Sequence, residues 1–141
     1  MLKRLVEKMR YDRGTEYEVV SGVSAGAINA HLLAQHHVGH EVEAVEAMEQ
    51  FWRDLAAVNT DLYKSWDWGL LAGFFYEGAL YDSANAFEFI EEKFAGKELV
   101  RNANIGLADI LNGQYKIFKD SRSPEDMVKI LQASLVYPGV L

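Results

Sequence analysis

The most informative segment of this 141-residue chain runs from Tyr17 to Ala34 and reads YEVVSGVSAGAINAHLLA. It opens with the apolar, β-branched run of a short buried strand over Tyr17–Val20. It closes with the pattern of a helix over Ala27–Ala34, rich in alanine and leucine. Between them stands Ser21–Gly26, which we expect to form a turn because glycine and serine are common turn residues. The segment therefore predicts a strand that passes through a tight turn directly into a helix.

The turn carries the pattern Gly-x-Ser-x-Gly, which in this context is typical of a nucleophile elbow. A sharp turn exposes the hydroxyl of Ser24 at a helix N-terminus, where free N–H groups favour developing negative charge. Gly22 and Gly26 let strand and helix approach without a side-chain collision, and the N–H of Ala25 is the natural first donor of an oxyanion hole. The alternative is a structural turn with no chemistry. The placement between strand and helix favours a catalytic serine at Ser24.

A serine nucleophile needs a base, and the histidines are poorly placed to supply it. All four follow the elbow closely, at His31, His36, His37 and His40. A helix rises about 1.5 Å per residue, so a continuing helix carries even His31 about 10 Å away from Ser24. A carboxylate base is therefore favoured.

Metal and cofactor chemistry find little support in the sequence. His36 and His40 are four residues apart and could share a helix face as metal ligands, but no third ligand has a recognisable spacing. A solvated helix end is the favoured interpretation, and we expect neither a metal nor a cofactor. The chain has no cysteine, which excludes disulfides and fits a reducing compartment, so an intracellular location is favoured.

The composition is that of one globular domain. The net charge of -7 makes nucleic acid an improbable partner. The N-terminus lacks the apolar core of a signal peptide, and the longest apolar stretch, Gly69–Tyr76, is too short to span a bilayer. Mixed patterns along the rest of the chain predict helices and strands in one α/β domain.

These further elements follow from apolar spacing, capping residues and turn signals. Helices are expected from Leu2 to Met9, from Glu41 to Ala57, from Asp82 or Ser83 as N-cap to Phe94, and from the N-cap Ser123 to about Ser134; strands are expected at Asn104–Ile110 and Gln114–Phe118, joined at Asn112-Gly113.

An aromatic, glycine-punctuated segment spans Leu62–Tyr81 and is expected to be irregular. Its tryptophans and tyrosines suit a membrane–water interface. The alternative, that these rings fill a core or cover a partner surface, is favoured because aromatic side chains are first of all core residues.

The segment from Gly22 to Ala30 closely resembles the nucleophile elbow of patatin-like phospholipases. The resemblance continues in order along the chain. Leu2–Val6 looks like the helix before the elbow strand, and Leu80–Asp82 looks like a segment downstream of the family's variable helices. Asn104–Phe118 looks like its paired central strands, and Ala133–Gly139 resembles its Ala-Ser-x-x-x-Pro-Gly stretch.

The resemblance implies a lipid acyl hydrolase of the phospholipase or acylglycerol esterase type, with a Ser–Asp dyad in which Ser24 is the nucleophile. It implies a patatin-like three-layer α/β arrangement with a mainly parallel sheet and a lipid or membrane-surface substrate. The family's glycine-rich oxyanion loop and its Asp-Gly pair have no counterpart in residues 1–141, where no Asp precedes a Gly. We therefore expect a single partial domain, truncated at both ends, and assign no catalytic aspartate. Asp109 and Asp120 do not match the motif and are expected to be surface or turn carboxylates.

Two alternatives remain open at this point. The chain is a fragment whose missing segments complete the sheet and restore activity, so that the 141 residues alone hydrolyse esters weakly or not at all. Otherwise it is a catalytically inactive structural or interaction subunit of a larger assembly, with a protein partner at its open sheet edge.

Overall fold

The computed structural model describes residues 2–8, 16–57, 64–65, 81–82, 84–119 and 123–136. Its helices are α1 (Leu2–Lys8), α2 (Ala25–Ala34), α3 (Glu41–Ala57), α5 (Ala84–Phe94) and α6 (Pro124–Leu135). Its strands are β1 (Val19–Val23), β2 (Lys64–Ser65), β3 (Tyr81–Asp82), β4 (Asn102–Asp109) and β5 (Gln114–Lys119). Helices packed on a sheet confirm the α/β class.

The sheet that carries the elbow has the strand order β1-β4-β5. Strands β1 and β4 are parallel, and Val23 lies opposite Gly106 at the end of the pairing. Strand β5 returns antiparallel to β4 through a hairpin in which Gly113 has a φ of +68°. The expected mainly parallel sheet is therefore a mixed one in the described part of the chain, because the Asn112-Gly113 turn reverses the chain immediately after β4.

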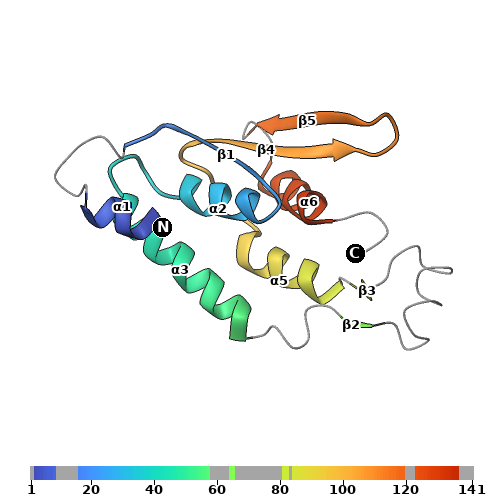
Figure 1. Ribbon diagram of the computed structural model, residues 1–141, viewed down its shortest axis with the longest axis horizontal. Coiled ribbons are helices and arrows are strands. Elements are labelled where there is room, and N and C mark those ends of the chain that lie inside the picture. Colours follow the sequence, from blue (N-terminus) through green and yellow to red (C-terminus); the bar gives the residue numbers. More distant parts are fainter. Residues whose placement is uncertain are drawn as a thin grey trace.

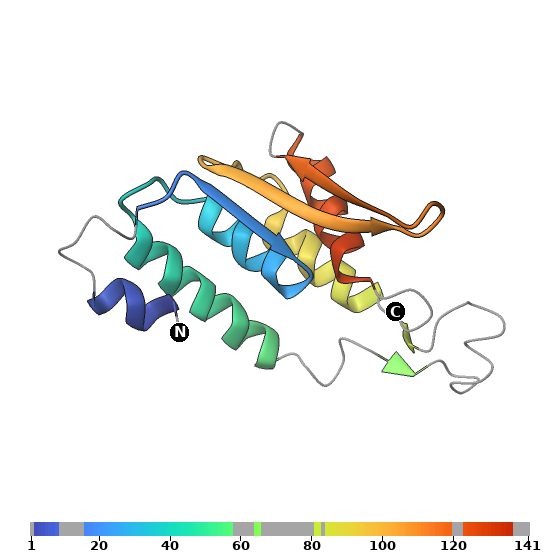
Figure 2. The ribbon, with the colours of Figure 1, turned by 45° about the horizontal axis from the view of Figure 1, so that its top comes forward.

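The described helices lie on one face of this sheet (Figures 1 and 2). Alternation along the strands sends Val20, Ala103 and Ile105 into the core beneath the sheet, against the buried side of α2. Helices α5 and α6 add Phe94, Leu131 and other apolar side chains to the same core. Among these residues the second helical layer of a three-layer arrangement is not seen, and Val19 on the opposite face is half exposed.

A buried ion pair ties the far end of α2 to the sheet. The guanidinium of Arg101 lies 2.8 Å from a carboxylate oxygen of Glu41, and its side chain has no exposed surface. The same group donates to the carbonyls of His36 and His37, each at 2.6 Å, and to that of Tyr17 at 3.2 Å. A buried charge needs such partners on all sides, and here they fix the loop that follows α2.

Several predicted elements lie within two residues of the observed bounds. Helix α3 begins and ends where its apolar pattern predicts, and the Ser123 hydroxyl caps α6 by accepting from the N–H of Asp126 at 3.2 Å. The N-cap prediction at Asp82 is wrong, because Asp82 pairs with Lys64 in the two-stranded β2–β3 ladder. Ser83 lies outside the described residues.

The aromatic segment Leu62–Tyr81 lies almost wholly outside the described residues, and so does Asp120. Within the described ranges, no helix combines the length and apolar character needed to cross a bilayer.

Candidate functional site

The elbow is tighter than its sequence predicts. We expected a turn over Ser21–Gly26, but strand β1 continues through Val23 and helix α2 already begins at Ala25. The reason is the parallel ladder, which pairs Ser21, Gly22 and Val23 with successive residues of β4. The reversal is therefore made at Ser24 alone.

Ser24 carries the backbone strain of this reversal. Its φ of 55° and ψ of -129° make it the one non-glycine residue with positive φ in the described ranges. Such a conformation costs on the order of 1 to 3 kcal/mol and persists only where the surroundings enforce it. The side chain of Ser24 is exposed, and it makes no capping hydrogen bond to α2. A strained, exposed serine at a helix N-terminus is the geometry that a nucleophile elbow requires.

Gly22 explains how strand and helix approach so closely. A Cβ atom at Gly22 would lie 1.9 Å from the carbonyl oxygen of Gly26 and 2.6 Å from the nitrogen of Ala27. Gly26 behaves differently, because a Cβ placed there meets no described atom within 4 Å. The expected need for a glycine is thus confirmed at Gly22. At Gly26 the expectation is wrong for the described residues, because a Cβ there enters open space.

The two backbone hydrogen-bonding groups of Ser24 are both engaged. Its carbonyl accepts from the N–H of Ala27 at 2.8 Å. Its N–H donates to the hydroxyl of Ser134 on α6 at 2.9 Å, and that hydroxyl donates in turn to the carbonyl of Gly106 at 2.9 Å. The Ser24 N–H is therefore already engaged within the protein.

The remaining donors at the elbow belong to the first turn of α2. No hydrogen bond engages the N–H of Ala25 or the hydroxyl of Ser24 within the described part of the chain. An N–H at a helix N-terminus is a favourable place for an oxyanion, because the helix dipole adds to the hydrogen bond. Ala25 is an exposed residue, as this role would require.

His31 is a core residue. Its side chain is 1% exposed, it packs edge-on against Phe94 with ring centroids 4.9 Å apart, and neither ring nitrogen has a partner among the described residues. Burial lowers the pKa of His31 to about 4. A histidine in this state is not a general base for Ser24, which agrees with the argument from helix rise.

His36 and His40 do not share a helix face, which was the disfavoured alternative, and the helix end favoured for them is a loop. Helix α2 ends at Ala34, so both residues lie in the loop before α3, where the carbonyl of His36 is held by Arg101. His40 lies 3.6 Å from Glu43. In the part of the chain that the structure describes, no three His, Asp or Glu side chains gather as metal ligands.

Asp109 is a turn carboxylate, as expected. It ends β4 and accepts from the side chain of Lys116, from the N–H of Leu111 at 3.1 Å and from the side chain of Asn112 at 3.0 Å. The bond from Lys116, followed by that from the Leu111 N–H, holds the pKa of Asp109 below its ordinary value. Asp109 thus stabilises the hairpin, and none of these three partners belongs to the elbow.

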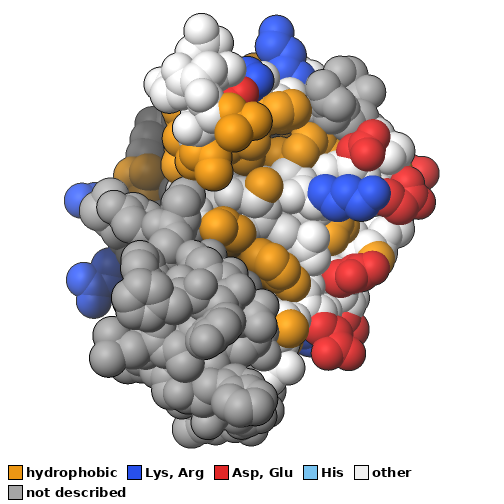
Figure 3. Space-filling model, turned by 90° about the vertical axis from the view of Figure 1, so that its right-hand side faces the viewer, with side chains coloured by type: hydrophobic (Ala, Val, Ile, Leu, Met, Phe, Trp, Pro, Cys, Tyr) orange, Lys and Arg blue, Asp and Glu red, His pale blue; other side chains and the backbone are white. Residues whose placement is uncertain are grey.

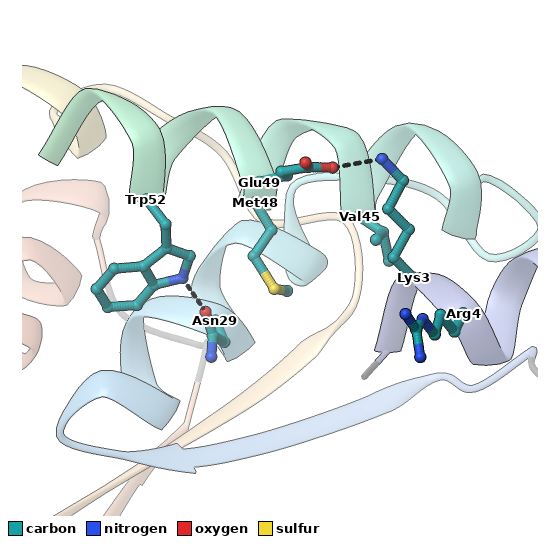
Figure 4. A pocket seen from close by; sticks show the side chains of 7 residues that line it. All are labelled: Lys3, Arg4, Asn29, Val45, Met48, Glu49 and Trp52. Carbon is teal, nitrogen blue, oxygen red and sulfur yellow. Dashed lines mark hydrogen bonds and ion pairs between the residues drawn. The ribbon is translucent and has the colours of Figure 1, made fainter. Parts of the chain in front are cut away.

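A groove of about 520 Å³ lies between α1, α2 and α3 (Figure 4). Its lining is Lys3, Arg4, Asn29, Val45, Met48, Glu49 and Trp52. Two contacts hold its walls: the indole N–H of Trp52 donates to Asn29 at 2.7 Å, and Lys3 pairs with Glu49 at 2.5 Å. None of the elbow residues Gly22–Gly26 lines this groove, so the groove is separate from the nucleophile.

An apolar surface lies at the β4–β5 hairpin, on the end of the molecule seen in Figure 3. We call it the hairpin patch: Ile110, Leu111, Tyr115 and Ile117, all exposed, with Leu111 at 94% and Ile110 at 71%. Because β1 and β4 are parallel, the hairpin and the elbow both follow the carboxyl ends of their strands, at the same end of the sheet. Val23 lies opposite Gly106, and a strand rises about 3.3 Å per residue, so Ile110 lies about 13 Å further along.

The sequence predicts Gly22, Ser24, Ala25 and Gly26 together at this site, and the structure places them at the junction of β1 and α2. The sequence assigns no role to Ser134, which lies within a segment that resembles a family stretch. No local pattern marks a serine that contacts a backbone group 110 residues away.

Comparison with known proteins supports the resemblance. The patatin-like phospholipase family matches residues 1–141, the whole chain. A search of curated proteins finds no match. A phospholipase family indicates hydrolase activity and lipid substrates. The chain belongs to the patatin-like phospholipase family.

Proposed function

We propose that the protein hydrolyses ester bonds of lipids with Ser24 as the nucleophile. The observation that carries the proposal is the strained, exposed Ser24 between β1 and the N-terminus of α2. Family membership supports the lipid substrate.

The proposed reaction has two steps. The hydroxyl oxygen of Ser24 bonds to the ester carbonyl carbon while its proton passes to a base, and the resulting oxyanion accepts from the N–H of Ala25. The alcohol leaves with that proton, and an acyl-enzyme remains on Ser24. Water then attacks the acyl carbon and gives its proton to the same base. The bond between the acyl carbon and the Ser24 oxygen breaks as the base returns that proton to the serine, which releases the fatty acid and restores the enzyme.

We propose that the base is an aspartate, as the family resemblance implies. Two observations support a carboxylate over a histidine. His31 is buried without a partner for its ring nitrogens among the described residues, and the other three histidines lie beyond the far end of α2. No carboxylate in the described ranges hydrogen-bonds to the Ser24 hydroxyl, so the aspartate stays unassigned.

We also propose that the hairpin patch meets the lipid surface. Ile110 and Leu111 are exposed at the tip of a hairpin that leaves the sheet on the same side as Ser24. Inserting apolar side chains into the membrane interface contributes binding free energy in proportion to the apolar area removed from water. Such an orientation brings the elbow towards its substrate.

A second candidate is a catalytically inactive subunit that binds a protein partner. The observation that favours it is the sheet face opposite the helices, where Val19, Val23, Tyr115 and Ile117 are exposed. Both faces of a sheet in an α/β fold are ordinarily covered.

Ester turnover separates the two candidates. The assay measures release of p-nitrophenol from a p-nitrophenyl ester by the chain, by Ser24→Ala and by the control Ser21→Ala, which removes an exposed hydroxyl three positions earlier on β1. The hydrolase requires turnover that Ser24→Ala abolishes and Ser21→Ala retains. Absence of turnover by a folded chain, together with no covalent adduct of a fluorophosphonate on Ser24, supports the inactive subunit, because an elbow that lacks only its base should still be labelled slowly.

The lipid-surface proposal has its own test, on phospholipid vesicles. The double variant Ile110→Asp and Leu111→Asp is expected to lose vesicle binding in flotation while its turnover of a soluble ester stays unchanged. Val38→Asp is the matched control, because Val38 is also exposed but lies in the loop at the other end of α2. Equal flotation of the wild type and the double variant contradicts the proposal.

A further inference from the structure

Ser134 joins α6 to the elbow through the hydrogen bonds of its hydroxyl. It lies in the last turn of α6 and is 9% exposed. Its hydroxyl accepts from the N–H of Ser24 and donates to the carbonyl of Gly106, each at 2.9 Å. Gly106 is the β4 residue opposite Val23, so one hydroxyl bridges the end of β1, its neighbour in β4 and the last turn of α6.

The direction of the two hydrogen bonds is fixed. The carbonyl of Gly106 accepts only, so the Ser134 proton is committed to it and a lone pair of the hydroxyl faces the Ser24 N–H. The partner groups are backbone groups in a partly or fully buried place, where a lost hydrogen bond leaves them unsatisfied. Alanine, which has neither a donor nor an acceptor in its side chain, can serve neither group.

The bond also acts on the strained residue itself. The carbonyl of Ser24 is held by Ala27, inside the turn, but its N–H is held by a side chain from a distant element. A residue at φ 55° and ψ -129° relaxes unless its surroundings hold it. Without Ser134, the peptide group before Ser24 loses the bond that sets its orientation, and the nucleophile and the Ala25 N–H lose their fixed relation.

We propose that Ser134 is a positioning residue for the nucleophile, which holds Ser24 in its strained conformation and turns the Ser24 N–H away from the oxyanion. This inference rests on the proposed function, since positioning matters only if Ser24 reacts. It assigns to α6 a role in the reaction besides its part in the core.

The test compares two serines at opposite ends of α6, Ser134 in its last turn and Ser123 as its N-cap. Ser134→Ala removes the bridging hydroxyl, and Ser123→Ala removes the N-cap of α6, an exposed hydroxyl that bonds Asp126 and does not touch the elbow. Two quantities are measured well below the melting temperature of each variant: the second-order rate of Ser24 labelling by a fluorophosphonate, and the hydrogen-exchange rate of the Ser24 amide by NMR.

In Ser134→Ala we expect labelling to slow by about threefold to tenfold, the effect of one lost hydrogen bond, and exchange of the Ser24 amide to speed up by at least as much. In Ser123→Ala both rates stay near those of the wild type, although the lost cap lowers its melting temperature. Unchanged amide exchange in Ser134→Ala overturns the inference, and so does an equal loss of labelling in both variants. A wild type without labelling at Ser24 contradicts the proposed function instead, and the amide exchange still decides the role of Ser134.

Discussion

Gly22 and Gly26 flank Ser24 symmetrically in the sequence, yet the structure predicts opposite results when each is replaced by alanine. At Gly22 the added methyl would lie 1.9 Å from the carbonyl oxygen of Gly26, and both of its other near neighbours are also backbone atoms of α2. At Gly26 the methyl enters open space among the described residues. The pair of variants therefore tests the close approach of β1 and α2 that creates the elbow.

The magnitudes follow from these contacts. Relief of the clash at Gly22 requires β1 and α2 to separate by about 1 Å, and overpacking of this kind typically costs about 1 to 3 kcal/mol. We expect about 3 kcal/mol, because backbone cannot rotate aside as a flexible side chain does. Gly26 lies in the first turn of α2 at an ordinary φ, so alanine stabilises by about 0.5 kcal/mol through a less flexible unfolded chain.

Urea denaturation of the wild type, Gly22→Ala and Gly26→Ala measures both changes in the free energy of unfolding. In thermal melting about 4 °C is expected per kcal/mol for a chain of this length, so the two variants should differ by more than 10 °C. Fluorophosphonate labelling of Ser24 should fall in Gly22→Ala, because the turn opens. A Gly22→Ala variant as stable as the wild type would refute the described approach of strand and helix.

Two further predictions concern buried ionisable side chains. Burial lowers the pKa of His31 from 6.5 to about 4, so below pH 6.5 the unfolded state binds a proton that the folded state does not. This difference should remove about 2 kcal/mol of stability between pH 7 and pH 5, and urea denaturation of His31→Leu should show a correspondingly weaker loss over the same interval. Equal pH dependence in both proteins would count against a buried neutral His31. Arg101→Ala leaves Glu41 buried without its cation and should destabilise by about 3 to 5 kcal/mol in urea, whereas Arg53→Ala, which loses an exposed pair, should change stability by less than about 1 kcal/mol.

Local patterns predict much of this fold because their signals are local. Helix α3 follows from an apolar face that repeats along one segment, and α6 from a serine cap with proline at its first position. The hairpin follows from Asn112-Gly113, where the turn itself requires positive φ. In each case the deciding interaction lies within a few residues.

The structure differs from the sequence prediction where contacts between distant segments determine the local conformation. Ser21–Val23 contain the residues of a turn, but pairing with β4 about 80 residues later makes them strand. The histidines after Ala34 lie in a loop because Arg101 holds the carbonyls of that loop. The bridging role of Ser134 depends on distant segments for the same reason. The motif predicts the elbow itself, whereas the hydrogen bond that joins the elbow to α6 depends on the packing of the whole fold.

The most direct test of the account is the site of covalent modification by a fluorophosphonate, read by peptide mass spectrometry. The chain has other serines as internal controls, among them the exposed Ser21 on the adjoining strand and Ser123 on α6. If Ser24 is the nucleophile, the adduct forms on Ser24 faster than on any other serine, disappears in Ser24→Ala and persists in Ser21→Ala. An adduct that forms elsewhere at an equal or higher rate, or no adduct on Ser24 in the folded chain, would contradict the assignment of Ser24 as the nucleophile.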